Sequence, residues 1–581
     1  MSSAESSPPS GEGSGGAVDV LTLEVLWNRL LSVVNEQQVT LMRTAFSTVV
    51  RESQDLACGV FDSRGNMAAQ SLTGTPGHIN AMATGVRHFL KVIPPETLVP
   101  GDVLITNDPW LTAGQINDMT VLSPVFFKDR VIGYFASCCH SPDVGGRVYG
   151  AAATEVYEEG IRIPIMHLFR GSEPNADLLA LIRANVRVPE ETVGDLYAQA
   201  ASNDVGARDL VRFLDEFGLD GLDGLADAII ARSERAMRDA IAELPDGAYR
   251  AENWADGFDD QPVHIAVTVT IAGDEVTMDF AGSSDQMSNG LNVVLNYTHA
   301  YASFAMKAAV NPEVPHNEGA FRPVHVTAPE GSIFNCREPA AVAARHLLGH
   351  MIPATVYAAL VQAMPGRLMA GGSDALWLTV WRGSWPGSHR LFTFSNFQSG
   401  GAGARATKDG LQTNGYPSGV AGVPAEVVES WAPLVMHRKA LVTDSGGAGR
   451  SRGGLTQEAE ISYRGDGHWG VSTLIERTRF PGNGLAGGRP GSLGRFQLAS
   501  GEKPPPKRLV PLPNDAHVQL VLPGGGGYGD PRERAPEKVL RDVVNGYVSL
   551  EAAEREYGVR IRYTGDPERL VRLPEHYVID A

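Results

Sequence analysis

The chain has 581 residues, 43% of them hydrophobic and 20% charged, and its formal net charge is −18. Because one hydrophobic core does not organise this length, we expect a globular protein of about two to four lobes. No basic stretch offsets the negative charge, and aromatic residues at 7% are sparse for base stacking. These numbers argue against a nucleic-acid partner.

The first residues, MSSAESSPPSGEGSGGA, lack the basic start and apolar centre of a signal peptide and predict a disordered tail over 1–18. The cysteines (Cys58, Cys138, Cys139 and Cys336) suit buried free thiols in a reducing compartment rather than a disulfide scaffold. No apolar run reaches the roughly 18 residues that a membrane span needs. We therefore expect a cytoplasmic protein without membrane contact.

From residue 19 the chain shows helical and strand patterns in turn. Leucines and valines at three- and four-residue steps predict an amphipathic helix over 19–46. Segment 56–70 predicts two strands joined by a hairpin turn, and a helix is expected near 80–92. Segments 101–108 and 120–140 are rich in β-forming residues and predict further paired strands.

The middle of the chain predicts helices over 174–244, strands over 262–280, and further helices over 295–310 and 341–364. The last third is rich in glycine, and a short helix is expected over 537–559. Helices and strands are grouped rather than strictly alternating. This grouping favours an α+β fold of several lobes with mixed sheets over a doubly wound sheet.

We divide the chain after the tail into an N-terminal lobe with the candidate site (19–245), a central α+β lobe (246–430), a glycine-rich β lobe (431–535) and a C-terminal helix and tail (536–581). None of the glycine-rich stretches fits a phosphate-binding or dinucleotide motif. We expect these glycines to serve tight turns and close backbone packing, and we assign no ATP site to this chain.

The stretch TNDPWLTAGQINDMT (106–120) holds more carboxylate and amide groups than a strand connection needs. If the neighbouring strands are adjacent, Asp118 and His140 end on the same rim. A carboxylate with an imidazole suits Mn²⁺ or Zn²⁺, and Asp55 offers a third ligand. A histidine of this kind is more often a packed structural residue, so the metal site and the structural role both stay open.

An acidic block, EVYEEGIRIPIMHL (155–168), places Glu155, Glu158 and Glu159 before a strand-like run. A solvated acidic turn and a role at the mouth of a cleft are equally good interpretations. The adjacent Cys138 and Cys139 lack the geometry of a nucleophile motif.

These features together resemble the hydantoinase B/5-oxoprolinase family, the B subunits of ATP-dependent cyclic-amide hydrolases, to which acetone and acetophenone carboxylase subunits are related. The matching motifs follow in one order along the chain and include GDVLITNDPW (101–110), HSPDVGG (140–146), DLYAQAASNDVGAR (195–208), ERTRFPGNGLAGG (476–488) and PGGGGYGDP (523–531). The resemblance covers nearly the whole chain.

The resemblance implies a divalent metal (Mn, Zn or Mg) held by Asp55, Gln115, Asp118 and His140, with Asp118, His140 and Asp143 as catalytic residues. Gln115 departs from the family, which usually has histidine there. An amide oxygen ligates hard cations but is a poor ligand for Zn²⁺. The site is thus expected to take Mn²⁺ or Mg²⁺, to bind metal weakly, or to be a purely polar substrate site.

The resemblance further implies a hetero-oligomer. A partner A-type subunit would bind ATP and phosphorylate the carbonyl oxygen of a lactam or imide, and water would open the activated ring on this chain. One alternative is a subunit of an ATP-dependent ketone carboxylase. Another is a non-catalytic partner subunit that has lost its metal, which Gln115 suggests.

Overall fold

The computed structural model describes residues 20–566, 568–569 and 571–580, so the predicted tail at 1–18 lies outside the described residues. The N-terminal lobe is built on a seven-stranded sheet of order β2-β1-β5-β4-β3-β6-β7. Its strands are β1 (Leu56–Asp62), β2 (Met67–Gln70), β3 (Val103–Thr106), β4 (Asp118–Phe127), β5 (Arg130–His140), β6 (Met166–Arg170) and β7 (Glu173–Pro174). The predicted hairpins and the adjacency of β3, β4 and β5 are confirmed.

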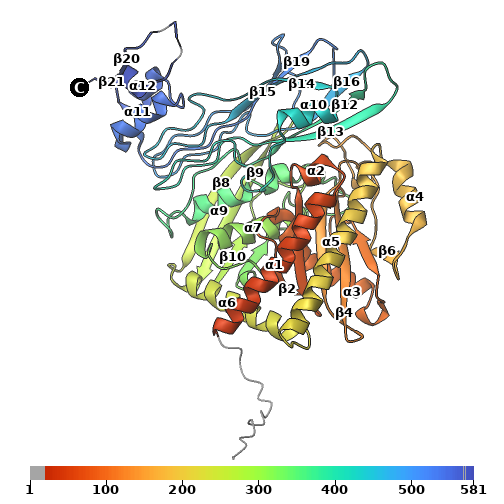
Figure 1. The fold of residues 1–581 in the computed structure, drawn as a ribbon. Coiled ribbons are helices and arrows are strands. Elements are labelled where there is room, and N and C mark those ends of the chain that lie inside the picture. Colours follow the sequence, from red (N-terminus) through yellow and green to blue (C-terminus); the bar gives the residue numbers. More distant parts are fainter. Residues whose placement is uncertain (1–19, 567, 570, 581) are drawn as a thin grey trace, which may run out of the picture.

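Helices cover both faces of this sheet. The amphipathic helix α1 (Val20–Thr44) lies beside α5 (Pro189–Glu216) on one face (Figure 1), and its predicted apolar stripe is buried there. Helix α3 (Pro76–Val92) packs on the opposite face. It begins earlier than predicted because Pro76 is suited to the first helical turn. The remaining helices of this lobe are α2 (Thr48–Arg51), α4 (Ala176–Asn185) and α6 (Asp223–Ala242).

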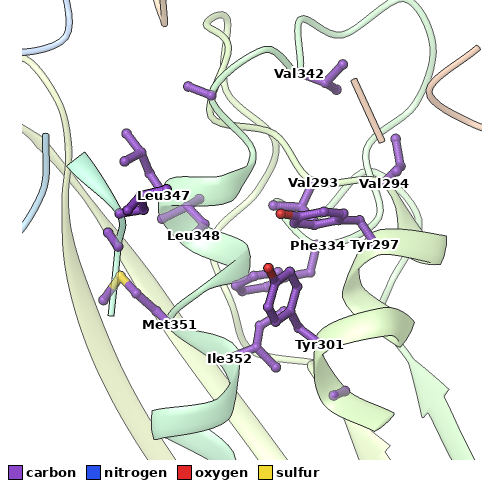
Figure 2. Close-up of a cluster of buried hydrophobic side chains, with 14 of the residues drawn as sticks. Val293, Val294, Tyr297, Tyr301, Phe334, Val342, Leu347, Leu348, Met351 and Ile352 are labelled. Atoms are coloured by element: carbon purple, nitrogen blue, oxygen red, sulfur yellow. The ribbon is translucent and has the colours of Figure 1, made fainter. Parts of the chain in front are cut away.

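The central lobe has a four-stranded sheet of order β11-β10-β9-β8, formed by β8 (Gly247–Phe258), β9 (Gln261–Ala272), β10 (Glu275–Asp279) and β11 (Val324–Thr327). Helices α7 (Leu295–Val310) and α9 (Ile352–Leu360) lie against it, and the short α8 (His346–Gly349) contacts α7. Figure 2 shows the rings of Tyr297 and Tyr301 on α7 packed near Leu348, Met351 and Ile352.

The helix predicted over 341–364 starts only at His346. The residues before it form a loop instead, because the backbone N–H groups of Val342 and Ala343 donate to the buried carboxylate of Glu159, at 2.8 and 2.7 Å. This interaction connects the acidic block of the N-terminal lobe to the central lobe. A pattern of apolar residues cannot reveal such a long-range bond.

The C-terminal part contains two four-stranded sheets of order β13-β12-β16-β18 and β14-β15-β19-β17, which share one core. Their strands are β12 (Trp377–Ser384), β13 (Leu391–Gln398), β14 (Leu434–Leu441), β15 (Gln457–Tyr463), β16 (Trp469–Leu474), β17 (Arg495–Leu498), β18 (Leu509–Leu512) and β19 (His517–Val521). Helix α10 (Ala425–Trp431) precedes β14. The first sheet thus joins strands from both sides of residue 430, where we had placed a boundary between lobes.

Glycine-rich segments run beside these sheets with their backbones in close contact. A Cβ atom on Gly401 would lie 2.0 Å from the carbonyl oxygen of Gly454, and one on Gly525 would lie 1.9 Å from that of Ala402. Only glycine allows chains to approach so closely. The close packing predicted for these glycines is therefore found.

The chain ends in a small unit, set apart at one side of the molecule in Figure 1. The single helix predicted over 537–559 is two helices, α11 (Pro536–Val544) and α12 (Leu550–Tyr557), because Gly546 at φ 75° breaks the first and Ser549 caps the second. Strands β20 (Ile561–Tyr563) and β21 (Tyr577–Ile579) complete this unit.

Short 3₁₀ helices lie at Pro95–Thr97, Val156–Glu158, Glu318–Ala320, Pro531–Glu533 and Pro574–His576. Across the described ranges, we find no helix that combines the length and apolarity needed to cross a bilayer.

Candidate functional site

Asp118 and His140 meet at one rim of the N-terminal sheet, as predicted. Asp118 opens β4, His140 closes β5, and the two residues are direct partners in the antiparallel ladder. The His140 Nδ1 atom lies 3.0 Å from Asp118 Oδ1, and both side chains are buried. The strand pairing alone therefore fixes a carboxylate beside an imidazole.

Gln115 completes this contact with its amide group. Its Nε2 atom lies 2.9 Å from Asp118 Oδ1 and 2.9 Å from His140 Nδ1. Its Oε1 atom accepts a hydrogen bond of 2.8 Å from the hydroxyl of Tyr149. In this orientation the amide donates to Asp118 and accepts from Tyr149, whereas the flipped one would set its oxygen against the Asp118 carboxylate.

Asp55 and His78 form the next part of the cluster. The Asp55 carbonyl accepts from the His140 backbone N–H at 3.1 Å, and its carboxylate accepts from Thr75 Oγ1 at 2.9 Å. His78 lies between the two acids, with Nε2 3.1 Å from Asp118 Oδ2 and Nδ1 3.6 Å from Asp55 Oδ1. His78 is not among the predicted site residues, because the helix expected near 80–92 starts beyond it.

Arg345 closes the cluster from the central lobe. It is buried, its Nη2 atom forms an ion pair with Asp118 Oδ2, and its Nε–H donates to the Ala113 carbonyl at 2.8 Å. The guanidinium lies 3.8 Å from the ring centroid of Tyr297. Arg345 is not among the predicted site residues either, although a buried arginine in an apolar stretch needs a carboxylate partner.

The charges of the cluster compensate one another. Burial alone would raise the pKa of Asp118, but the charges of His78 and Arg345 outweigh it and hold that pKa well below its usual range. Burial alone would lower the pKa of His78, but the carboxylates of Asp118 and Asp55 outweigh it and raise that pKa. Two carboxylates therefore face an arginine and a histidine that favours its charged form.

A small cavity of about 20 Å³ lies beside these side chains, and its lining includes His78, His140 and Arg345 as well as Phe397 of the C-terminal sheets. That volume is enough for about one water molecule. Among the described residues, neither Nε2 of His140 nor Nη1 of Arg345 has a hydrogen-bond partner, and both side chains line the cavity. An imidazole nitrogen and a guanidinium donor are thus available to a bound molecule.

The predicted ligands Asp55, Gln115, Asp118 and His140 do come together, but as they lie they do not fit a divalent cation. Gln115 turns its NH₂ group, a donor, toward the acid and the imidazole, and Arg345 occupies the other Asp118 oxygen. Within the described residues, no three His, Cys, Asp or Glu side chains are arranged to hold a metal ion. The predicted metal stays a prediction that these contacts do not support.

Asp143, predicted as catalytic, is not brought into the cluster. Its Oδ1 atom lies 2.7 Å from Nη1 of Arg187 and 3.3 Å from the Gly145 N–H, so it organises the turn after β5. Asp108 likewise pairs with Arg162, at 2.9 Å from its Nε.

The cysteines are all buried and unpaired, as expected. Burial raises the pKa of the Cys138 and Cys139 thiols well above the usual range, so both stay protonated.

Comparison with known proteins identifies the family. The profile of the hydantoinase B/oxoprolinase family matches residues 19–531, and the chain belongs to that family. It is 31% identical to a protein named as the B-type subunit of a D-/L-hydantoinase from Pseudomonas sp. (strain NS671), over 94% of this chain and 95% of that protein. It is also 31% identical to the β-subunit of the caprolactamase of Pseudomonas jessenii, over 94% and 97%.

Solved structures confirm the α+β fold. The crystal structure of the ATP-dependent caprolactamase from Pseudomonas jessenii superposes with a TM-score of 0.86 at 28% identity, covering 97% of this chain and 100% of that one. A nucleotide-free acetone carboxylase structure gives a TM-score of 0.85 at 19% identity, covering 96% and 81%. At that lower identity the similarity shows the fold alone. The hydantoinase and caprolactamase relatives are both named as subunits, which implies that they work with a partner chain.

Proposed function

We propose that this chain is the B-type subunit of an ATP-dependent cyclic-amide hydrolase, and that it opens a lactam or imide ring which a partner A-type subunit has phosphorylated. The observation that carries this proposal is the buried Asp118–His140 pair with Arg345 beside it, in which His140 and Arg345 line a cavity for about one water molecule. The relatives named as a hydantoinase subunit and a caprolactamase subunit support the same class of substrate.

The chemistry follows from the contacts of these side chains. Phosphorylation of the carbonyl oxygen removes the amide resonance that protects the ring. Water then attacks the activated carbon and passes a proton to Nε2 of His140, while Asp118 holds Nδ1 and stabilises the imidazolium. Arg345 offers Nη1 to the negative charge that develops on oxygen.

The attack moves the C=N electron pair to the ring nitrogen, which takes back the proton held by His140. The ring opens when the carbon–nitrogen bond breaks, as the new hydroxyl becomes the acyl C=O and its proton completes the leaving amine. The product of this step is an acyl phosphate, which a second water molecule hydrolyses to a carboxylate and inorganic phosphate. His78 keeps Asp55 and Asp118 compensated throughout. In this scheme the Gln115 amide contacts the side chains of both His140 and Asp118 and keeps them in place.

The test is His140→Ala in the assembled complex, supplied with ATP and a cyclic amide. We expect ring opening to fall by at least about a hundredfold, since a positioned acid–base group contributes about that much or more. His325→Ala, on the exposed edge of β11, is the matched control and should keep full activity. Full activity of His140→Ala would refute the mechanism, and turnover that required bicarbonate and a ketone would favour the carboxylase alternative.

A further inference from the structure

A second cavity, of about 320 Å³, shares the residue Tyr149 with the small cavity at the buried cluster. Tyr149 lines both cavities, and its carbonyl accepts a hydrogen bond of 2.8 Å from Ser472 Oγ on β16. The walls come from the loop after β5, from the acidic block and from the C-terminal sheet. We call this cavity the cationic pocket because of the side chains that line it.

Basic groups dominate the lining of the cationic pocket: Arg147, Arg187, Arg382 and Lys507. Three of them have carboxylate partners, but those carboxylates are not part of the lining: Glu158 for Arg147, Asp143 for Arg187 and Glu476 for Lys507. The carboxylates therefore contact these basic groups from outside the lining of the pocket. Arg382, on β12, has no polar partner in the part of the chain that the structure describes.

Glu159, the one acidic residue of the lining, is itself buried and incompletely bonded. Its Oε1 atom accepts from the N–H groups of Val342 and Ala343, whereas its Oε2 atom has no partner among the described residues. Burial raises the pKa of Glu159 to about 8, so at neutral pH its carboxyl is mostly protonated. A protonated Oε2 adds a hydrogen-bond donor to the lining.

We propose that the cationic pocket binds the phosphoryl group of the activated substrate beside Tyr149, the residue that it shares with the cavity at His140. This inference rests on the proposed function. Arginine and lysine are the side chains that bind phosphoryl oxygens, and the cavity volume is at the lower end of the range for small-molecule sites. The ligand class is therefore a small organic phosphate, and the inorganic phosphate formed later in the reaction has the same charged group.

The surroundings of the cationic pocket agree with this assignment. Arg187, Arg382 and Leu509 also line a larger cavity of about 820 Å³, which adjoins the cationic pocket. The larger cavity offers a path by which an anionic intermediate reaches the cationic pocket.

The probe is inorganic phosphate, titrated calorimetrically into the full chain at constant ionic strength. Arg382→Gln should weaken phosphate binding by about tenfold or more, because it removes a charge-assisted hydrogen bond. Arg390→Gln is the matched control, since this exposed arginine lies next to the same hairpin but outside the lining. Wild-type chain that binds no phosphate, or equal binding by Arg382→Gln and wild type, would overturn the inference.

Kinetics of the assembled complex provide the second readout. Inhibition of ring opening by added phosphate should weaken in Arg382→Gln by the same factor as the binding, and unchanged inhibition would count against the pocket. His140→Ala should bind phosphate like the wild type while failing to open rings. Equal phosphate binding by Arg382→Gln and wild type therefore removes the phosphate site alone. A fully active His140→Ala removes the proposed mechanism, and the phosphate site is then judged by the binding measurement.

Discussion

The ion pair between Arg345 and Asp118 gives the sharpest test of how the site is built. In Arg345→Met the guanidinium is replaced by an apolar chain of similar length. Asp118 then keeps only His78 as a nearby positive charge, at 3.1 Å. The substitution also removes the hydrogen bond to the Ala113 carbonyl and the contact with the Tyr297 ring.

The expected cost follows from the burial of the pair. Arg345 is 2% exposed and Asp118 is fully buried, so the carboxylate cannot recover its lost partner from water. Removing one member of a buried pair costs about 3–5 kcal/mol. Because His78 still compensates the charge of Asp118 in part, we expect Arg345→Met to lower the free energy of unfolding by about 3 kcal/mol. Removing both charges in Asp118→Asn with Arg345→Met should cost less than the sum of the single changes, by about 1–3 kcal/mol.

Hydrogen exchange in peptides from β4 and β5 measures this cost locally. A loss of about 3 kcal/mol corresponds to roughly hundredfold faster exchange, since each 1.4 kcal/mol is tenfold. Arg322→Met, which removes an exposed pair with Glu234, is the control and should change exchange by less than about fivefold. Exchange in Arg345→Met that matches this control, or strict additivity in the double variant, would refute the reasoning.

Two further predictions concern protons and metal. Because the folded pKa of Glu159 is about 8 against an ordinary 4.5, its stabilising contribution is complete below pH 4.5 and is lost as the pH rises through 8. The free energy of unfolding of Glu159→Gln should therefore equal that of wild type at pH 4 and exceed it by a few kcal/mol at pH 9. An equal difference at both pH values would contradict this. Protein that has been dialysed against Mn²⁺ and then against buffer should retain well below one ion per chain by elemental analysis. One bound ion per chain that is lost in Asp118→Asn would contradict the conclusion that these side chains do not fit a divalent cation.

The parts of the site that the sequence predicts are those set by neighbouring strands. The hairpin between β4 and β5 is a local feature, since its turn residues and alternating strands are contiguous. Once that hairpin forms, Asp118 and His140 must face each other at its open end. Their meeting could therefore be predicted with no knowledge of the rest of the chain.

The parts that the sequence does not predict arrive from distant segments. Arg345 lies 227 residues from its partner Asp118, and Tyr149 meets Gln115 across a gap of 34 residues. No periodicity relates such positions, because their contact depends on how the lobes pack. A partial signal exists for Arg345, which stands with His346 and His350 in an otherwise apolar run, since charged residues are rarely buried without partners.

The loop after β5 explains why Asp143 belongs to the functional region although it does not touch the cluster. At one end of this loop Asp143 holds Arg187 in the wall of the cationic pocket. At the other end Tyr149 donates to Gln115, which contacts both Asp118 and His140. One segment therefore positions a proposed phosphate-binding group and an amide that orients the proposed catalytic pair. A substrate phosphorylated at its carbonyl oxygen carries its charge directly beside its reactive carbon, so a segment that contacts both sites can place that carbon relative to His140.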